Sequence, residues 1–142
     1  MPKNTAQIKS RQRVKDHAEV FTAEREVKAM CDLVNDELSR IDSKVLEPSC
    51  GNGNFLVEIY ARKLKNCKDE KDGLKALASI VGIDIQADNC EESRKRLMAQ
   101  YLEAFPNANE VCILLAAGIL QNNIICGDGL KIMKRWEPKD GN

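Results

Sequence analysis

The stretch Lys44-Val-Leu-Glu-Pro-Ser-Cys-Gly-Asn-Gly-Asn-Phe55 sets a short apolar segment, an acid and a glycine-rich loop in immediate succession. Val45-Leu46 predicts a buried strand that ends at Glu47, and the loop holding Gly51 and Gly53 leads into a helix. A strand, a glycine loop and a helix in this order form a ligand crevice at the carboxyl end of a parallel sheet. The glycines let a ligand approach the backbone closely, and the helix start offers N–H groups and a positive dipole to an anion.

The loop departs from the dinucleotide-binding fingerprint, which needs a third glycine three residues after the second. Leu56 stands at that position, so the close helix–strand contact of the fingerprint is not expected. A ligand without a pyrophosphate fits better, and S-adenosyl-L-methionine offers an ammonium, a carboxylate, a ribose and an adenine. A plain strand-to-helix turn in an α/β domain is the alternative that the loop alone leaves open.

Composition places the chain among globular proteins. Its 142 residues are enough for one domain with a modest core. A hydrophobic content of 43% and a mean hydropathy of -0.42 predict a soluble protein without a membrane span or a secretory signal. The net charge is zero, so composition gives no bulk electrostatic reason for nucleic-acid binding. Six scattered cysteines without a Cys-x-x-Cys pair predict reduced thiols in a cytoplasmic protein, not a disulfide framework or a zinc site.

The sequence divides into a basic arm, residues 1–20, and a domain, residues 21–142. The arm carries basic side chains and no acid over its first fifteen positions: Lys3, Lys9, Arg11, Arg13 and Lys15. Such an arm can contact phosphate groups, and a solvated terminus is the alternative.

Hydrophobic periodicity predicts the other elements. An amphipathic helix is expected over about 23–41, with Thr22 as its N-cap and Phe21 as a hydrophobic staple. Further helices are expected over about 54–66, 87–104 and 110–119, and strands over 78–85 and 123–126. The charged residues 67–75, which include Gly73, predict a surface connection. The chain from residue 130 onward predicts a short turn or helix followed by a polar end.

This order of elements predicts an α/β fold with a parallel sheet of about three strands. Right-handed crossovers place both connecting helices on one face if the strands progress in one direction. The N-terminal helix is expected to pack beside the others, so the second face stays uncovered. Because an exposed apolar face is unusual in a soluble monomer, we expect a completing chain or self-association through that face.

Acids follow all three predicted strands: Glu47, Asp84 and Asp128. Strand ends lie side by side in the crevice of a doubly wound sheet, so the three carboxylates are expected to converge there. Asp84 can accept hydrogen bonds from ribose hydroxyls, Asp128 can accept from an adenine amino group, and Glu47 can hold water or an ammonium group. Each acid could instead cap a helix or a turn. Cys50 and Cys126 are expected to be small packing residues, and no nucleophile–base pair or metal cluster is visible.

Four segments together resemble the N-terminal, cofactor-binding part of S-adenosyl-L-methionine-dependent N6-adenine DNA methyltransferases of bacterial restriction–modification systems. They are Glu19-Val20-Phe21-Thr22, the residues from Val45 to Phe55, Gly82-Ile83-Asp84-Ile85 and Cys126-Gly127-Asp128-Gly129-Leu130. The resemblance covers nearly the whole chain, and its second segment is the most specific. It implies an incomplete Rossmann-like class I methyltransferase fold with helices mainly on one face of the sheet.

The resemblance also implies which residues bind the cofactor: Phe21, Thr22, Glu47, Pro48, Ser49, Gly51, Gly53, Asp84, Ile85, Asp128 and Gly129. Phe21 and Thr22 would open a helix against the methionine part of S-adenosyl-L-methionine. The complete enzyme would bind DNA and transfer a methyl group to adenine N6.

The chain departs from this family at three places. Ala23 stands where the family has a proline after Phe-Thr, and Gln86 replaces the second acid of the ribose-binding strand. The catalytic motif, an Asp or Asn followed by Pro-Pro and an aromatic residue, is absent because no proline of the chain has a proline neighbour. The sequence ends about where the fourth strand is expected, so we expect a cofactor-binding part that is inactive alone. A protein or RNA methyltransferase fragment of the same fold and a non-catalytic assembly module stay open as alternatives.

Overall fold

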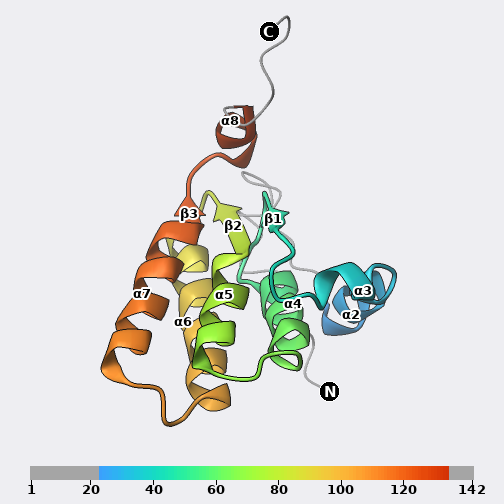
Figure 1. Cartoon of the computed structure of the whole chain (residues 1–142). Coiled ribbons are helices and arrows are strands. Elements are labelled where there is room, and N and C mark those ends of the chain that lie inside the picture. The colour runs from blue at the N-terminus through green and yellow to red at the C-terminus, as the bar shows by residue number, and fades with distance from the viewer. Residues whose placement is uncertain (1–22, 135–142) are drawn as a thin grey trace, which may run out of the picture.

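The computed structural model describes residues 23–134 (Figure 1). Over this range the chain forms seven helices and three strands, and none of these helices is long and apolar enough to cross a membrane. Their bounds are Glu24–Asp32 (α2), Asn35–Leu38 (α3), Val45–Glu47 (β1), Asn54–Leu64 (α4), Glu70–Ala78 (α5), Ile80–Asp84 (β2), Ala87–Ala104 (α6), Glu110–Asn123 (α7), Ile124–Cys126 (β3) and Gly129–Lys134 (α8).

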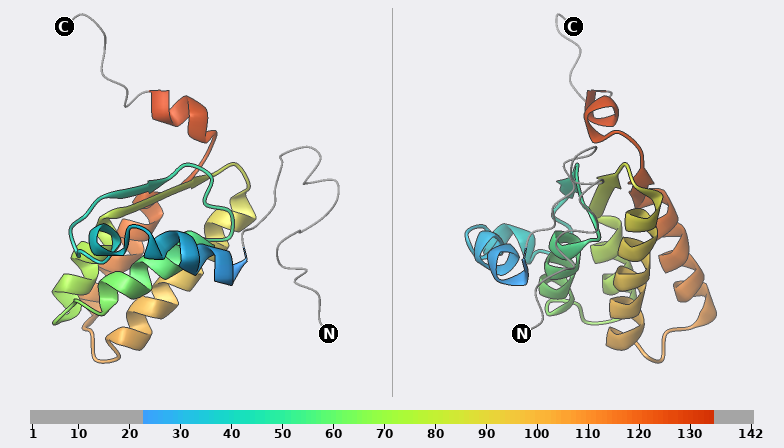
Figure 2. Two further views of the ribbon diagram at one scale, coloured as in Figure 1. Left: turned by 90° about the vertical axis from the view of Figure 1, so that its right-hand side faces the viewer. Right: turned by 180° about the vertical axis from the view of Figure 1, so that it is seen from behind.

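The three strands form one parallel sheet in the order β1-β2-β3, which confirms the predicted α/β topology. Val45 pairs with Ile80, and Asp84 pairs with Cys126, so the carboxyl ends of the strands meet at one edge. Figure 2 shows helices α4 to α7 on the same face of this sheet. Right-handed crossovers between strands that progress in one direction produce this one-sided arrangement.

The core lies between the sheet and these helices. Its fully buried members include large apolar side chains from four elements: Leu56 and Tyr60 of α4, Leu77 of α5, Ile80 of β2, and Leu97 and Tyr101 of α6. The Tyr60 hydroxyl donates to the carbonyl of Gly73 at 2.9 Å, so the buried phenol keeps a hydrogen-bond partner. Burying each large apolar side chain contributes about 1.5–3 kcal/mol, which makes this cluster the main source of stability.

The second face of the sheet is not covered by helices α2 to α7 (Figure 2). Val45 and Ile80 belong to the helix side, so the two-residue alternation directs Leu46, Val81 and Ile125 to the other side. These three side chains are half-buried, whereas Ile83, which pairs with Ile125 on the same side, is fully buried. The helices therefore form a layer on one side as predicted, the second side is only partly exposed, and a chain or copy that would cover it stays a prediction.

The single helix predicted over 23–41 is wrong, because the structure divides it into α2 and α3. Val34 leaves the helical region with φ -130° and ψ 29°. Arg62 of α4 donates to the carbonyl of Lys28 and to the side chains of Asp32 and Asn35, and so ties both sides of the break to α4. Ala23 is the N-cap and makes no side-chain bond, so Thr22 is not the cap, and Thr22 itself lies outside the described residues.

The surface connection predicted over 67–75 is also wrong, because most of it belongs to α5. Asp69 caps this helix by accepting a hydrogen bond from the backbone N–H of Asp72 at 2.9 Å. Gly73 is buried inside the helix, and a Cβ atom there would lie 2.3 Å from Cε2 of Phe105. The glycine thus makes room for an aromatic ring of the α6–α7 connection and does not mark a loop.

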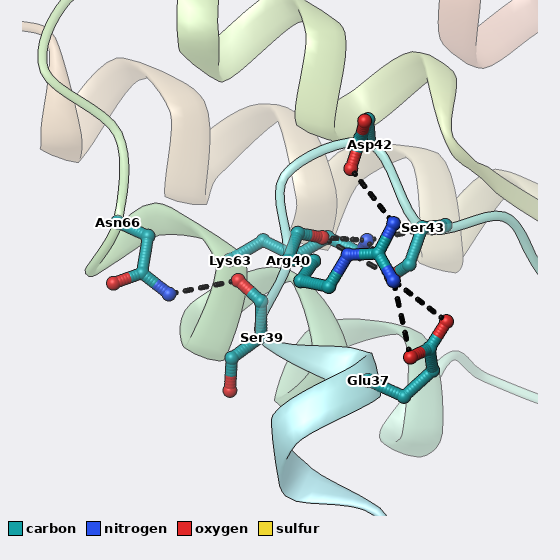
Figure 3. Close-up of polar contacts among 7 residues, drawn as sticks. All are labelled: Glu37, Ser39, Arg40, Asp42, Ser43, Lys63 and Asn66. Carbon is teal, nitrogen blue, oxygen red and sulfur yellow. Dashed lines mark hydrogen bonds and ion pairs between the residues drawn. The ribbon is translucent and has the colours of Figure 1, made fainter.

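Lys63 of α4 holds the turn that leads into β1 (Figure 3). Its side chain is fully buried, and Nζ donates to the carbonyls of Arg40 and Ser43 and to the Ser43 hydroxyl. All three donors of the ammonium group are therefore used. Burial lowers the pKa of Lys63 from its ordinary value, and the three oxygens offset this cost. Asn66 adds a bond from Nδ2 to the Ser39 carbonyl at 2.8 Å, which closes the turn.

Candidate functional site

A crevice of about 330 Å³ opens at the carboxyl ends of the strands, between the loops that follow β1, β2 and β3. Its lining consists of eight residues from those loops: Pro48, Ser49, Asp84, Ile85, Gly127, Asp128, Gly129 and Leu130. This is the edge where ligands bind in open α/β sheets. The volume lies at the lower end of the range of small-molecule pockets.

Asp84 is the structural centre of the crevice. Its Oδ1 accepts from the backbone N–H of Gly51 at 3.2 Å. Its Oδ2 accepts from the backbone N–H of Gln86 and from the Asn89 side chain, both at 3.0 Å. The carboxylate thereby connects the glycine loop after β1 with the first turn of α6. A carboxylate has about four acceptor positions, so these three bonds leave room for a further donor.

Asp128 caps the helix that follows it. Its Oδ1 accepts from the backbone N–H groups of Leu130 and Lys131 at 3.0 and 3.3 Å, so the capping alternative is correct for this oxygen. The second carboxylate oxygen makes no hydrogen bond with the described residues. One acid therefore both shapes the loop and presents an acceptor at the crevice.

Gly129 sets how closely the loops after β1 and β3 approach each other. A Cβ atom at this position would lie 2.3 Å from the carbonyl oxygen of Pro48. Because that neighbour is backbone, a larger residue cannot be accommodated by rotating a side chain. The glycine lets the two loops close the crevice from opposite sides.

The glycine loop has the backbone that the sequence predicts. Gly51 and Gly53 have positive φ angles of 55° and 96°, a region that side chains disfavour. Gly53 is the N-cap of α4 and provides no side-chain bond to its first turn. A Cβ at Gly53 would also lie 2.8 Å from Oγ of the buried Ser93. The start of α4 thus keeps its positive dipole end without an acidic cap.

Glu47 does not line the crevice, which corrects the expectation that three acids converge there. It is half-buried at the end of β1, and its Oε1 accepts from the Ser49 backbone N–H at 3.1 Å. Burial raises the pKa of the Glu47 carboxyl, and the Ser49 bond partly opposes this shift. The carboxylate therefore shapes a loop whose other residues, Pro48 and Ser49, form the lining.

The structure brings six of the predicted site residues together as crevice lining: Pro48, Ser49, Asp84, Ile85, Asp128 and Gly129. Gly51 bonds to Asp84 behind the lining, and Gly53 begins α4. Phe21 and Thr22 lie outside the described residues. Sequence reasoning missed the lining residues Gly127 and Leu130, which lie within two residues of Asp128, and it missed Asn89, whose contact with Asp84 has no sequence signal.

The packing role predicted for two cysteines holds for one of them. Cys50 is buried in the core, where burial raises the pKa of its thiol to about 12. Cys126 is exposed at the end of β3, so the prediction is wrong for this residue. All six cysteines are free thiols in this structure.

The crevice presents hydrogen-bond acceptors beside apolar walls. Its polar groups are carboxylate acceptors and loop backbone, and its apolar walls include Ile85 and Leu130, whose exposed fractions are 53% and 75%. Across residues 23–134, no group of His, Cys, Asp and Glu side chains could hold a metal ion. The arrangement suits a ligand with hydroxyl or amino donors and a flat apolar face.

Comparison of the chain with protein-family models, with curated proteins and with solved structures gives no match.

Proposed function

We propose that this chain is the S-adenosyl-L-methionine-binding portion of an adenine-specific DNA methyltransferase of the restriction–modification type, with a Rossmann-like class I architecture. The observation that carries the proposal is the crevice itself. Two carboxylates, Asp84 and Asp128, and two exposed apolar side chains, Ile85 and Leu130, lie around one hollow at the strand ends. Exposed apolar side chains beside unused acceptors are what a ribose joined to a flat base requires.

In this proposal different residues of the crevice bind different parts of the cofactor. Asp84 accepts from the ribose hydroxyls with the acceptor position that its three protein bonds leave open. The second oxygen of Asp128 accepts from the adenine amino group, and Ile85 and Leu130 cover the two ring faces. The start of α4, without an acidic cap, faces the methionine carboxylate.

The bound cofactor would supply a sulfonium methyl group for transfer to adenine N6. The residues that line the crevice would hold the cofactor and orient it. The sequence contains no Asp/Asn-Pro-Pro-aromatic motif to bind a flipped adenine, so we expect no turnover by this chain alone. Methyl transfer to unmethylated DNA by the pure chain would contradict that expectation.

Calorimetric titration with S-adenosyl-L-methionine tests the proposal. We expect saturable binding by the wild-type chain and binding weakened by roughly tenfold or more in Asp84→Asn, since a charge-assisted hydrogen bond is lost. Asp36→Asn is the matched control, because Asp36 is an exposed acid of α3 remote from the crevice lining. Equal weakening in both variants would exclude a specific role for Asp84.

A non-catalytic assembly module is the second candidate, and one observation favours it. Both crevice acids already have structural roles, since Asp84 ties the glycine loop to α6 and Asp128 caps α8. If Asp84 and Asp128 serve only to make those structural hydrogen bonds, their presence in the crevice does not imply a cofactor. Absence of both heat and a thermal shift with S-adenosyl-L-methionine would select this candidate.

A further inference from the structure

Three cysteines lie on the helix side of the sheet near its carboxyl edge: Cys50, Cys90 and Cys126. Ile124 of β3 is part of the core beneath the sheet, so the two-residue alternation directs Cys126 to the same side. Helix α6 crosses that side, and Cys90 stands in its first turn. The fold therefore brings together two thiols that are 36 residues apart in the sequence.

Both thiols contact the same short segment of backbone. The Cys90 Sγ lies 3.5 Å from the carbonyl of Asp84 and 3.6 Å from that of Ile125, the residue before Cys126. The Cys126 Sγ lies 3.6 Å from the carbonyl of Ile85. Burial, and after it the neighbouring Cys126 thiol, raise the pKa of Cys90 to about 11. These contacts place both sulfur atoms beside the carbonyls at the end of β2.

The two thiols differ in access to solvent. Cys126 is exposed at the rim of the crevice, and Cys90 is 1% exposed beneath it. We propose that Cys126 and Cys90 form an oxidation-sensitive dithiol, in which a peroxide oxidises Cys126 and Cys90 then closes a disulfide between β3 and α6. At oxidation-sensitive sites an exposed thiol often stands next to a second thiol that can resolve it.

The step balances with hydrogen peroxide as the oxidant. The Cys126 thiolate attacks one peroxide oxygen, the O–O bond breaks, and the products are a sulfenic acid and hydroxide. The Cys90 sulfur then attacks the Cys126 sulfur, the S–O bond breaks, and the S–S bond forms with release of one water molecule. Two electrons pass from the two thiols to the peroxide. A reducing thiol reverses the reaction.

The disulfide would change the crevice because both cysteines adjoin its residues. Gly127 and Asp128 follow Cys126 directly, and Asn89, which donates to Asp84, precedes Cys90. Joining the two sulfur atoms draws the end of β3 toward α6 and shifts Asp128 relative to Asp84. We expect the affinity for S-adenosyl-L-methionine to fall by roughly fivefold or more. This consequence rests on the proposed function, whereas disulfide formation does not.

Peptide mapping without reductant, after treatment of the full chain with hydrogen peroxide, tests the dithiol directly. The expected product is a Cys90–Cys126 disulfide that dithiothreitol removes. Cys126→Ser should abolish it, and because Cys126 is exposed this variant keeps its fold. Cys67→Ser is the matched control, since Cys67 lies at the end of α4 away from the crevice. Sulfenic or sulfinic acid without a disulfide, or a disulfide that joins Cys50 instead, would overturn the proposal.

Calorimetry on the oxidised and reduced chains tests the consequence. Weaker binding by the oxidised wild type, with no difference for oxidised Cys126→Ser, supports the link to the crevice. Formation of the disulfide with unchanged affinity overturns that link. Failure of the reduced chain to bind S-adenosyl-L-methionine counts against the proposed function alone, because the peptide map does not depend on it.

Discussion

The two ends of the sheet are held in opposite ways. At the amino end, the ammonium group of Lys63 is fully buried and donates all of its hydrogen bonds to the turn of residues 40–43 (Figure 3). At the carboxyl end, Asp84 and Asp128 face an open crevice, and each keeps acceptor capacity beyond its protein bonds. The first region is a closed network, and the second is an incomplete one.

This difference indicates which end of the sheet serves binding. A buried polar network that is fully satisfied specifies one structure and has nothing left to offer a ligand. Acceptors that stay open to solvent beside exposed apolar side chains, as at Ile85 and Leu130, are available to a ligand. We therefore expect substitutions at the closed end to change stability, and substitutions at the open end to change ligand affinity as well.

The largest expected effect follows from Lys63→Met. The substitution removes three charge-assisted hydrogen bonds, each worth about 1.5–3 kcal/mol, and takes the donor from the Ser43 carbonyl, while the Arg40 carbonyl keeps the Ser43 N–H and hydroxyl as donors. We expect the free energy of unfolding in urea to fall by about 3 kcal/mol or more. Cofactor affinity of the folded fraction should be unchanged.

Lys65→Met is the matched control for this experiment, because Lys65 is an exposed lysine at the C-cap of α4, two residues after Lys63. It should change stability by less than about 0.5 kcal/mol. A loss as small in Lys63→Met as in this control would contradict the closed-network interpretation.

Gly129→Ala should have the next largest effect, and it acts on the open end. The new methyl group would meet the Pro48 carbonyl and force the loops after β1 and β3 apart. Overpacking of this kind costs about 1–3 kcal/mol, and the displaced Asp128 should also weaken cofactor binding. Urea unfolding and calorimetry measure the two effects. Gly118→Ala is the control, since a Cβ there meets no atom within 4 Å. Unchanged binding by Gly129→Ala would show that the contact between the two loops does not determine cofactor affinity.

Asp69→Ala should have a smaller effect that is confined to stability. It removes the N-cap bond of α5, for which we expect about 1 kcal/mol of destabilisation in urea. Because α5 contributes no residue to the crevice lining, affinity for S-adenosyl-L-methionine should stay the same. A loss of affinity here would show that the crevice responds to general loosening of the fold.

Glu47→Gln should give the smallest change, an increase in stability with no change in binding. Burial raises the pKa of Glu47 above its value in the unfolded chain, so the native state holds more protons between the two values. Wild-type stability therefore falls as the pH rises through the window above about 4.3, the ordinary glutamate pKa. The variant should melt at a higher temperature than wild type at pH 7 and at the same temperature below pH 4.

Binding provides the second readout for Glu47. The variant should bind S-adenosyl-L-methionine as tightly as the wild type does, because Glu47 does not line the crevice. A lower melting temperature at pH 7 would mean that the ionised Glu47 stabilises the native state, against the burial argument.

Much of the fold could be predicted because the strands and the helices α4 and α6 have clear apolar patterns and glycine boundaries. Helix α5 was missed because its charged start resembles a loop, although Asp69 followed by acids is itself a helix-start signal. The break between α2 and α3 could not be predicted, since it depends on Arg62, which bonds to both segments from α4. The burial of Lys63 had one signal in the sequence, which is its position on the apolar face of α4.

The site was predictable in its location and less so in its details. The apolar pattern shows where each strand ends, and Asp84, Asp128 and the glycine loop lie at those strand ends as predicted. Which carboxylate oxygens the protein itself uses depends on loop geometry. Glu47 bonds to its own loop and leaves the lining for that reason, and Cys126 is exposed because β3 is an edge strand that ends there.

The most direct test is a two-dimensional amide NMR titration of the isotope-labelled chain with S-adenosyl-L-methionine. The account predicts saturable shifts of the amides of Gly51, Gly53, Gly127 and Gly129, with those of the Lys63 network unmoved. No saturable shift, or shifts confined to residues outside the three loops of the crevice, would contradict it.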